Sequence, residues 1–250
     1  MISSIIIAGG AVLGALVGSY LATALLRWPH GISASRGRSR CDSCAAPLAA
    51  LSLVPILSYL AQHGRCRNCG AAIAPDHLVV ELAATLIGGV SAGLFGETPQ
   101  LAIATALFGW ILLLLAALDL RHFWLPDRLT LPLAGLGLLV QTAGTGPSIM
   151  SAVIGMAAGY GSLAGVGWAY HRLRGHEGLG GGDPRMFGAI GAWLGWQWLP
   201  WVLVIAAGSG LAAVAVLTIF RRDIGRTERL PLGTLMALAA WPLWLADRLV

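Results

Sequence analysis

Two aspartates stand at the edges of long apolar segments, where carboxylates are rare. Asp119 ends the run ILLLLAALD, and Asp183 follows three glycines and precedes another apolar segment. Ionisable groups at membrane depth are costly and usually functional. Two carboxylates that meet cannot both ionise readily, so one can take a proton from water while the other polarises a peptide carbonyl. The residues alone also fit helix caps or local pairs with Arg121 or Arg185.

Other residues near these aspartates could support a site. Gly180 and Gly182 lack a Cβ, so the backbone there could approach a substrate strand closely. Asp127, in the sequence Leu-Pro-Asp, precedes an apolar segment and equally fits a helix cap or a first-turn acid. Glu81 lies early in the second apolar segment, where we expect it to be buried and paired or in contact with a ligand.

Four cysteines form two Cys-x-x-Cys pairs separated by 21 residues, which are Cys41 with Cys44 and Cys66 with Cys69. This spacing is typical of a tetrahedral four-cysteine zinc site, in which every position is filled and the metal is structural. Disulfides, free thiols or a redox dithiol remain alternatives. A zinc ion would stabilise a segment that is too small to build its own core.

The composition excludes an ordinary soluble domain. Of the 250 residues, 57% are hydrophobic and only 11% are charged, whereas soluble domains carry about 25% charged residues. Apolar runs of helix length without period-2 alternation predict an all-α polytopic membrane protein. We expect a retained first helix at 1–27, a zinc-binding domain at 28–77 and a seven-helix membrane domain at 78–250. The eight predicted spans are 4–26, 78–95, 100–119, 125–143, 149–170, 186–199, 200–220 and 231–246.

The basic residues are all arginines, and their placement predicts an orientation. They gather in alternate loops, while the linkers 96–99, 143–148 and 196–200 contain none. This positive-inside pattern places the arginine-bearing loops, both aspartates and the cysteine segment on the cytoplasmic side. Topology and contact with membrane lipid therefore explain the net charge of +5 without a nucleic-acid partner.

The order of these motifs resembles the bifunctional type IV prepilin leader peptidase and N-methyltransferase family. The resemblance covers most of the chain and rests on an ordered set of short motifs rather than on any one of them. Their residues are Gly18-Ser19-Tyr20-Leu21, the two cysteine pairs, Val80-Glu81, Ala117-Leu118-Asp119, Leu125-Pro126-Asp127, Gly180, Gly182-Asp183, Gly191 to Gln197 and, weakly, Pro231-Leu232-Gly233.

This resemblance implies an eight-helix enzyme of the bacterial inner membrane. Asp119 and Asp183 would cleave the short basic leader of type IV prepilins or type II secretion pseudopilins on the cytoplasmic side. Asp127 and Glu177 are our candidates for receiving the positive leader. The N-terminal half would methylate the new amino terminus with S-adenosylmethionine, and Glu81 is the candidate residue beside that cofactor.

Two rival functions make different predictions. A membrane N-methyltransferase without efficient peptidase activity would need a cofactor pocket near Glu81 and the cysteine segment. A zinc-bearing scaffold of a pilus or secretion machine would tolerate substitution of both aspartates.

Overall fold

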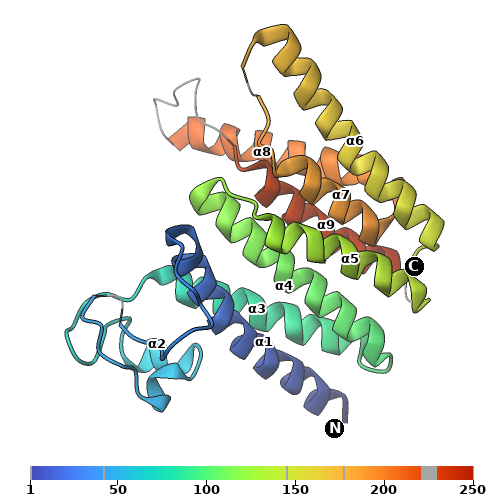
Figure 1. The fold of residues 1–250 in the computed structure, drawn as a ribbon. Helices are drawn as coiled ribbons and strands as arrows, with labels where there is room; N and C mark the ends of the chain where they lie inside the picture. Colours follow the sequence, from blue (N-terminus) through green and yellow to red (C-terminus); the bar gives the residue numbers. More distant parts are fainter. Residues whose placement is uncertain (1, 42, 145, 177, 221–229, 250) are drawn as a thin grey trace. The chain divides into compact units, whose positions relative to one another are not determined.

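The computed structural model describes residues 2–41, 43–144, 146–176, 178–220 and 230–249, and these residues form helices and no strands (Figure 1). The predicted all-helical fold is therefore confirmed for this part of the chain. The chain divides into two compact units, residues 1–114 and 115–250.

The first unit is built on two long helices. Its elements are α1 (Ile2–Arg27), η1 (Trp28–His30), η2 (Ala50–Leu53), α2 (Leu57–Ala61), α3 (Pro75–Phe95) and the beginning of α4 (Pro99–His122). Gly10, Gly14 and Gly18 recur every four residues and so form one stripe on α1. A Cβ at Gly14 would collide with the backbone of Ala84, and a Cβ at Gly10 with that of Gly88, both on α3. Small residues thus bring the two helix backbones into direct contact, as is usual in lipid.

The second unit is organised around one short, buried helix. It comprises the end of α4, then α5 (Asp127–Thr142), α6 (Ile149–Arg174), α7 (Asp183–Leu194), η3 (Trp196–Trp198), α8 (Leu199–Phe220) and α9 (Leu232–Leu249). Helix α7 contacts α5, α6, α8 and α9, and every residue on it except Arg185 is buried. At 12 residues it is about 18 Å long, which is shorter than the roughly 30 Å hydrocarbon core.

Glycines also allow α6 to approach α7. A Cβ at Gly155 would collide with the backbone at Gly191, and one at Gly159 would lie 2.7 Å from the carbonyl oxygen of Phe187. Gly155 and Gly159 thus bring the two backbones into direct contact. Gly167, further along α6, has only the side chain of Leu179 nearby, at 3.7 Å.

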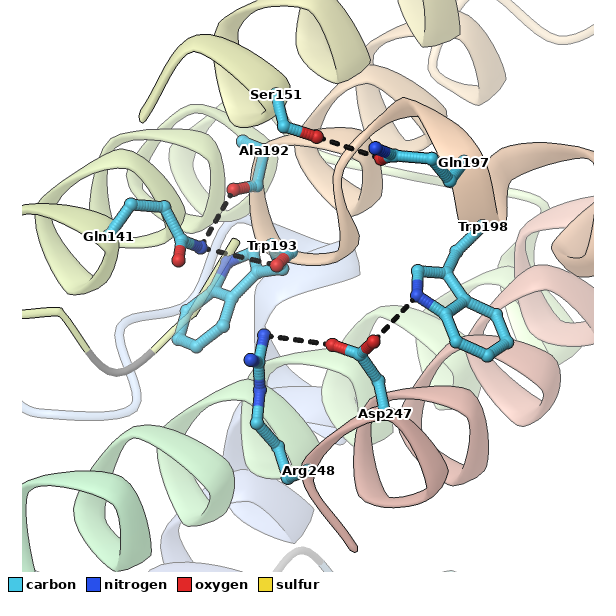
Figure 2. A network of polar contacts seen from close by, with 8 residues as sticks. All are labelled: Gln141, Ser151, Ala192, Trp193, Gln197, Trp198, Asp247 and Arg248. Atoms are coloured by element: carbon cyan, nitrogen blue, oxygen red, sulfur yellow. Dashed lines mark hydrogen bonds and ion pairs between the residues drawn. The ribbon is translucent and has the colours of Figure 1, made fainter. Parts of the chain in front are cut away.

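The C-terminal end of α7 is fixed by polar side chains from its neighbours (Figure 2). The amide of Gln141 donates to the carbonyl oxygens of Ala192 and Trp193, each at 3.2 Å. These carbonyls belong to the last turn, which has no helical partners of its own. The Trp193 indole donates to the Leu133 carbonyl at 2.8 Å. Side chains of α5 and α7 thus hold the C-terminal end of α7 in place.

A second pair of contacts in the same region ties helix ends together (Figure 2). Ser151 at the start of α6 donates to Gln197 in η3 at 2.8 Å. The Trp198 indole donates to the Asp247 carboxylate on α9 at 2.8 Å, and Asp247 also pairs with Arg248 at 3.1 Å. These hydrogen bonds therefore link α6, η3 and α9 near the C-terminal end of α7.

Helices occur at all eight positions predicted as spans, but eight membrane spans are not confirmed. Five segments of the described chain are long and apolar enough to cross a membrane: Ser3–His30, Pro75–Phe95, Pro99–His122, Ile149–Arg174 and Trp196–Val216. The predicted boundary between the spans 186–199 and 200–220 is wrong in position, because α7 ends at Leu194 and the chain turns at Gly195. The φ of +77° at Gly195 favours glycine.

Candidate active site and metal site

Asp119 lies in the last turn of α4 and is buried, with 5% of its surface exposed. Its Oδ2 accepts hydrogen bonds from the backbone N–H of Thr234 at 2.8 Å and from the Thr234 hydroxyl at 3.2 Å. The N–H group belongs to the first turn of α9, where backbone N–H groups have no helical acceptor and favour a negative charge. The carboxylate on α4 thus caps α9.

Asp183 is the first residue of α7 and is also buried, at 7% exposed. Its Oδ2 accepts a hydrogen bond from the backbone N–H of Gly180 at 3.1 Å, while its own N–H donates to the Gly180 carbonyl at 3.1 Å. The glycine run therefore folds back around the carboxylate. A Cβ at Gly180 would lie 2.9 Å from the same Oδ2, so the turn leaves little room for a side chain there.

The structure brings the two aspartates together from helices 64 residues apart in sequence. Both lie close to Leu125: Gly182, which precedes Asp183, approaches its Cβ, and Gly233 approaches both its Cδ1 and Oδ2 of Asp119. Each carboxylate has one oxygen fixed by a backbone N–H group, from Thr234 or from Gly180. Two adjacent, buried and oriented carboxylates form the arrangement that can share a proton and activate water.

Leu125 lies close to two glycines of the site, Gly182 before Asp183 and Gly233 before Thr234. It is buried, at 7% exposed, and it follows α4 in the short connection to α5. A Cβ at Gly182 would lie 2.6 Å from the Leu125 Cβ, and a Cβ at Gly233 would lie 2.9 Å from its Cδ1 and 3.0 Å from Asp119 Oδ2. Close approach to the Leu125 Cβ therefore requires glycine at 182, whereas at 233 a Cβ would meet only the ends of the Leu125 and Asp119 side chains.

The remaining acidic candidates lie in different environments. Asp127 is the first residue of α5, and it forms an ion pair with Arg185 on α7 at 2.6 Å. Both side chains are about half exposed, so such a pair contributes little stability. Arg185 thus pairs with Asp127 and not with Asp183, which removes one of the alternatives that the sequence left open. Glu177 lies outside the described residues.

The four cysteines converge in the first unit. Their sulfur atoms all lie within 4.8 Å of one another, and Cys41 and Cys69 are 4.0 Å apart. Four sulfurs around a tetrahedral zinc at about 2.3 Å would lie about 3.8 Å apart. No disulfide joins the four, so each thiol can serve as a ligand. The donor set and its spacing therefore fit zinc.

Each Cys-x-x-Cys pair is held in the same kind of tight turn. The N–H of Cys41 donates to Ala46 and that of Cys66 donates to Ala71, while residues 45 and 70 donate back to the two cysteine carbonyls. Ala45 and Gly70 both have positive φ, at 55° and 73°. Hydrogen bonds from the Asn68 side chain and from the Ala46 backbone lower the pKa of the Cys44 thiol to about 6, which favours the thiolate that binds metal.

Glu81 is buried on α3 in the same unit, at 6% exposed. Its Oε2 accepts a hydrogen bond from the backbone N–H of Ile56 at 2.7 Å. Glu81 also lines a cavity of about 160 Å³, together with Arg27, Arg40, Tyr59 and residues of the cysteine segment. Glu81 is thus buried and hydrogen-bonded, as expected from the sequence. The cavity beside it was not predicted.

Sequence reasoning missed Thr234 and the contact that it makes. The weak match at Pro231-Leu232-Gly233 was the only signal near it, and it ends one residue before the donor. The pairing of Asp127 with Arg185 was also missed, because nothing in the sequence links positions 58 residues apart.

The described residues thus define a helical protein with candidate membrane spans, two buried aspartates that meet and a four-cysteine cluster. Residues 12–95 match the family described as "Bacterial Peptidase A24 N-terminal domain", and residues 106–217 match the "Type IV leader peptidase family". The chain belongs to the type IV leader peptidase family, as the resemblance implied.

Curated relatives carry the name "Prepilin leader peptidase/N-methyltransferase". One from Burkholderia pseudomallei (strain K96243) is 43% identical over 202 residues, which are 80% of this chain and 64% of the relative. One from Aeromonas salmonicida is 41% identical over 205 residues, which are 82% of this chain and 69% of the relative. One from Pseudomonas aeruginosa is 37% identical over 203 residues, with coverages of 81% and 69%. The chain thus spans less than two thirds of the length of the Burkholderia relative. No solved structure matches this chain significantly.

Proposed function

We propose that this protein is a leader peptidase that cleaves type IV prepilins or type II secretion pseudopilins with Asp119 and Asp183. The observation that carries the proposal is that two buried carboxylates converge beside Leu125, each with one oxygen fixed by a backbone N–H group. The names of its relatives and its family membership support the same activity.

In this mechanism the pair begins with one proton shared between the two carboxyl groups. The ionised carboxylate takes a proton from water as the oxygen attacks the scissile carbonyl, while the protonated carboxyl donates to the carbonyl oxygen. The tetrahedral intermediate collapses when a proton passes to the leaving amine. The products are a free amino terminus and a leader carboxylate, and the pair again holds one proton.

The substrate enters at the end where both aspartates lie. The arginine distribution supports an inner-membrane protein with this end facing the cytoplasm. The glycine run at 180–182 offers backbone that a substrate strand can approach. Asp127, half exposed and paired with Arg185, and Glu177 are the acidic groups that we assign to the basic leader.

The zinc ion has a structural role in this proposal. Cys41, Cys44, Cys66 and Cys69 would hold it with four thiolates, which leaves no position open for a reacting water. The ion would hold together the two cysteine turns in a segment with few buried apolar residues. We retain the division into a first helix at 1–27, a zinc domain at 28–77 and a membrane domain at 78–250.

We also propose that the first unit methylates the new amino terminus, because it holds a cavity beside Glu81. S-adenosylmethionine bound there would supply the methyl group. The cavity has both charge types that this zwitterionic cofactor needs, since Arg27 and Arg40 can face a carboxylate and Glu81 can face an amino or sulfonium group. Glu81 would also keep Ile56 in place through the hydrogen bond at 2.7 Å.

The test measures both activities in one reaction. Purified protein is incubated with a prepilin or pseudopilin and labelled S-adenosylmethionine, and the products are identified by mass spectrometry. We expect Asp119→Asn and Asp183→Asn each to leave only a small residual rate of cleavage while methylation of a pre-cleaved substrate persists. Glu97→Gln is the control, since it removes an exposed carboxylate in a connecting turn. Cleavage that survives both aspartate substitutions would refute the peptidase mechanism.

A further inference from the structure

Thr234 is the residue that connects α9 to Asp119. It lies in the first turn of α9 and is buried, at 8% exposed. Its backbone N–H and its hydroxyl both lie within hydrogen-bonding distance of Oδ2 of Asp119, at 2.8 Å and 3.2 Å. The hydroxyl also faces the carbonyl oxygen of Ala116, at 2.9 Å. Thr234 therefore contacts α4 at two places that are one helical turn apart.

The Thr234 hydroxyl has one proton for two acceptors. When it donates to Ala116, its lone pairs can accept a hydrogen bond from a protonated Asp119. When it rotates and donates to Asp119, it stabilises the ionised carboxylate, because hydrogen bonds to a charged acceptor are the stronger ones. Rotation about the Cβ–Oγ1 bond thus satisfies either protonation state, and no covalent bond is broken. The backbone N–H cannot do this, since it is always a donor.

We propose that Thr234 is a positioning residue of the active site. Its hydroxyl donates a hydrogen bond to Asp119 when that carboxylate is ionised and accepts one when it is protonated. The inference rests on the proposed aspartate pair and adds a third element to it, the first turn of α9. A carboxylate that must alternate between charged and neutral in a buried site needs a partner that can both donate and accept. Asp183 has a different partner, the N–H of Gly180, which can only donate. Of these two arrangements, the one at Asp119 therefore includes a hydroxyl that can accept a hydrogen bond as well as donate one.

The test compares two substitutions that differ in the hydroxyl group. Thr234→Val keeps the branched shape and the backbone N–H but removes the hydroxyl, and Thr234→Ser keeps the hydroxyl. Initial rates of prepilin cleavage give kcat and KM, and the melting temperature of each purified variant controls for folding. We expect Thr234→Val to lower kcat about three- to tenfold at unchanged KM, since the hydrogen bond is long and its proton is shared. Thr234→Ser should stay within about twofold of the original rate.

The outcomes separate this inference from the proposed function. Equal kcat in Thr234→Val and the unmodified protein, or equal losses in the valine and serine variants, would overturn the role of the hydroxyl. If Thr234→Val does not fold, Thr234→Ala takes its place in the comparison with serine. Asp119→Asn is assayed in parallel. Cleavage that survives Asp119→Asn would overturn the aspartate pair itself, whereas loss of cleavage there with no effect of Thr234→Val would overturn the role of Thr234 alone.

Discussion

Adjacent glycines before Asp183 should respond very differently to alanine. A Cβ at Gly182 would lie 2.6 Å from the Cβ of buried Leu125, whereas a Cβ at Gly181 meets nothing within 4 Å. Gly182 has an ordinary helical backbone, with φ −83° and ψ −26°, and Gly181 is not among the positive-φ glycines of the described chain. The difference between the two variants is therefore steric.

The magnitude follows from the distance that must open. Two carbon atoms pack at about 3.5–4.0 Å, so Gly182→Ala must push Leu125 and the start of α7 apart by about 1 Å. Overpacking of this kind costs about 1–3 kcal/mol. A misplacement of about 1 Å in a catalytic group can lower the rate roughly 100-fold. We expect kcat for prepilin cleavage to fall about 10- to 100-fold in Gly182→Ala.

The assay measures cleavage rates and melting temperatures for both purified variants. Gly181→Ala should keep both close to those of the unmodified protein. A loss of activity as large in Gly181→Ala as in Gly182→Ala would refute the steric reasoning and would assign the glycine run a role in substrate contact instead. Full activity in Gly182→Ala would show that Leu125 moves away without disturbing Asp183.

Three further predictions concern the first unit. Purified protein should contain about one zinc per chain by elemental analysis, and Cys41→Ser should lose most of it; zinc retained in full would contradict the four-cysteine site. Gly14→Val should lower the melting temperature because its side chain would collide with α3, whereas Gly9→Ala should not, since a Cβ there meets nothing within 4 Å; equal melting temperatures would refute the close packing. Glu81→Gln should reduce methyl transfer to a pre-cleaved substrate and leave cleavage intact, and unchanged methyl transfer would exclude Glu81 from that site.

The sequence predicted those features that depend on local composition. Apolar runs predicted helices at the eight positions because each run is long and lacks alternation. The Cys-x-x-Cys spacing predicted the cysteine cluster because a tight turn places both sulfurs on one side. Asp119 and Asp183 were candidates because carboxylates at the edge of apolar segments are rare, but helix caps and arginine pairs also fitted them, and the family resemblance selected them as the predicted catalytic pair.

Features that depend on packing between distant segments were not predictable. The contact between Thr234 and Asp119 joins residues 115 positions apart. The close approach of Leu125 to Gly182 and Gly233 brings together three segments that are far apart in the sequence. Hydropathy also could not distinguish α7 from a spanning helix. Its 12 residues are buried because neighbouring helices surround them, and a protein environment and lipid favour the same apolar residues.

The central claim is that Asp119 and Asp183 act as one catalytic unit, and a double substitution tests it most directly. Single-turnover cleavage of a prepilin is measured for Asp119→Asn, for Asp183→Asn and for the protein carrying both changes, with melting temperatures to confirm folding. Because residues that act together show non-additive effects, the double variant should be no slower than the slower single variant. Losses that multiply in the double variant would show that the two aspartates act independently, and that result would contradict the account.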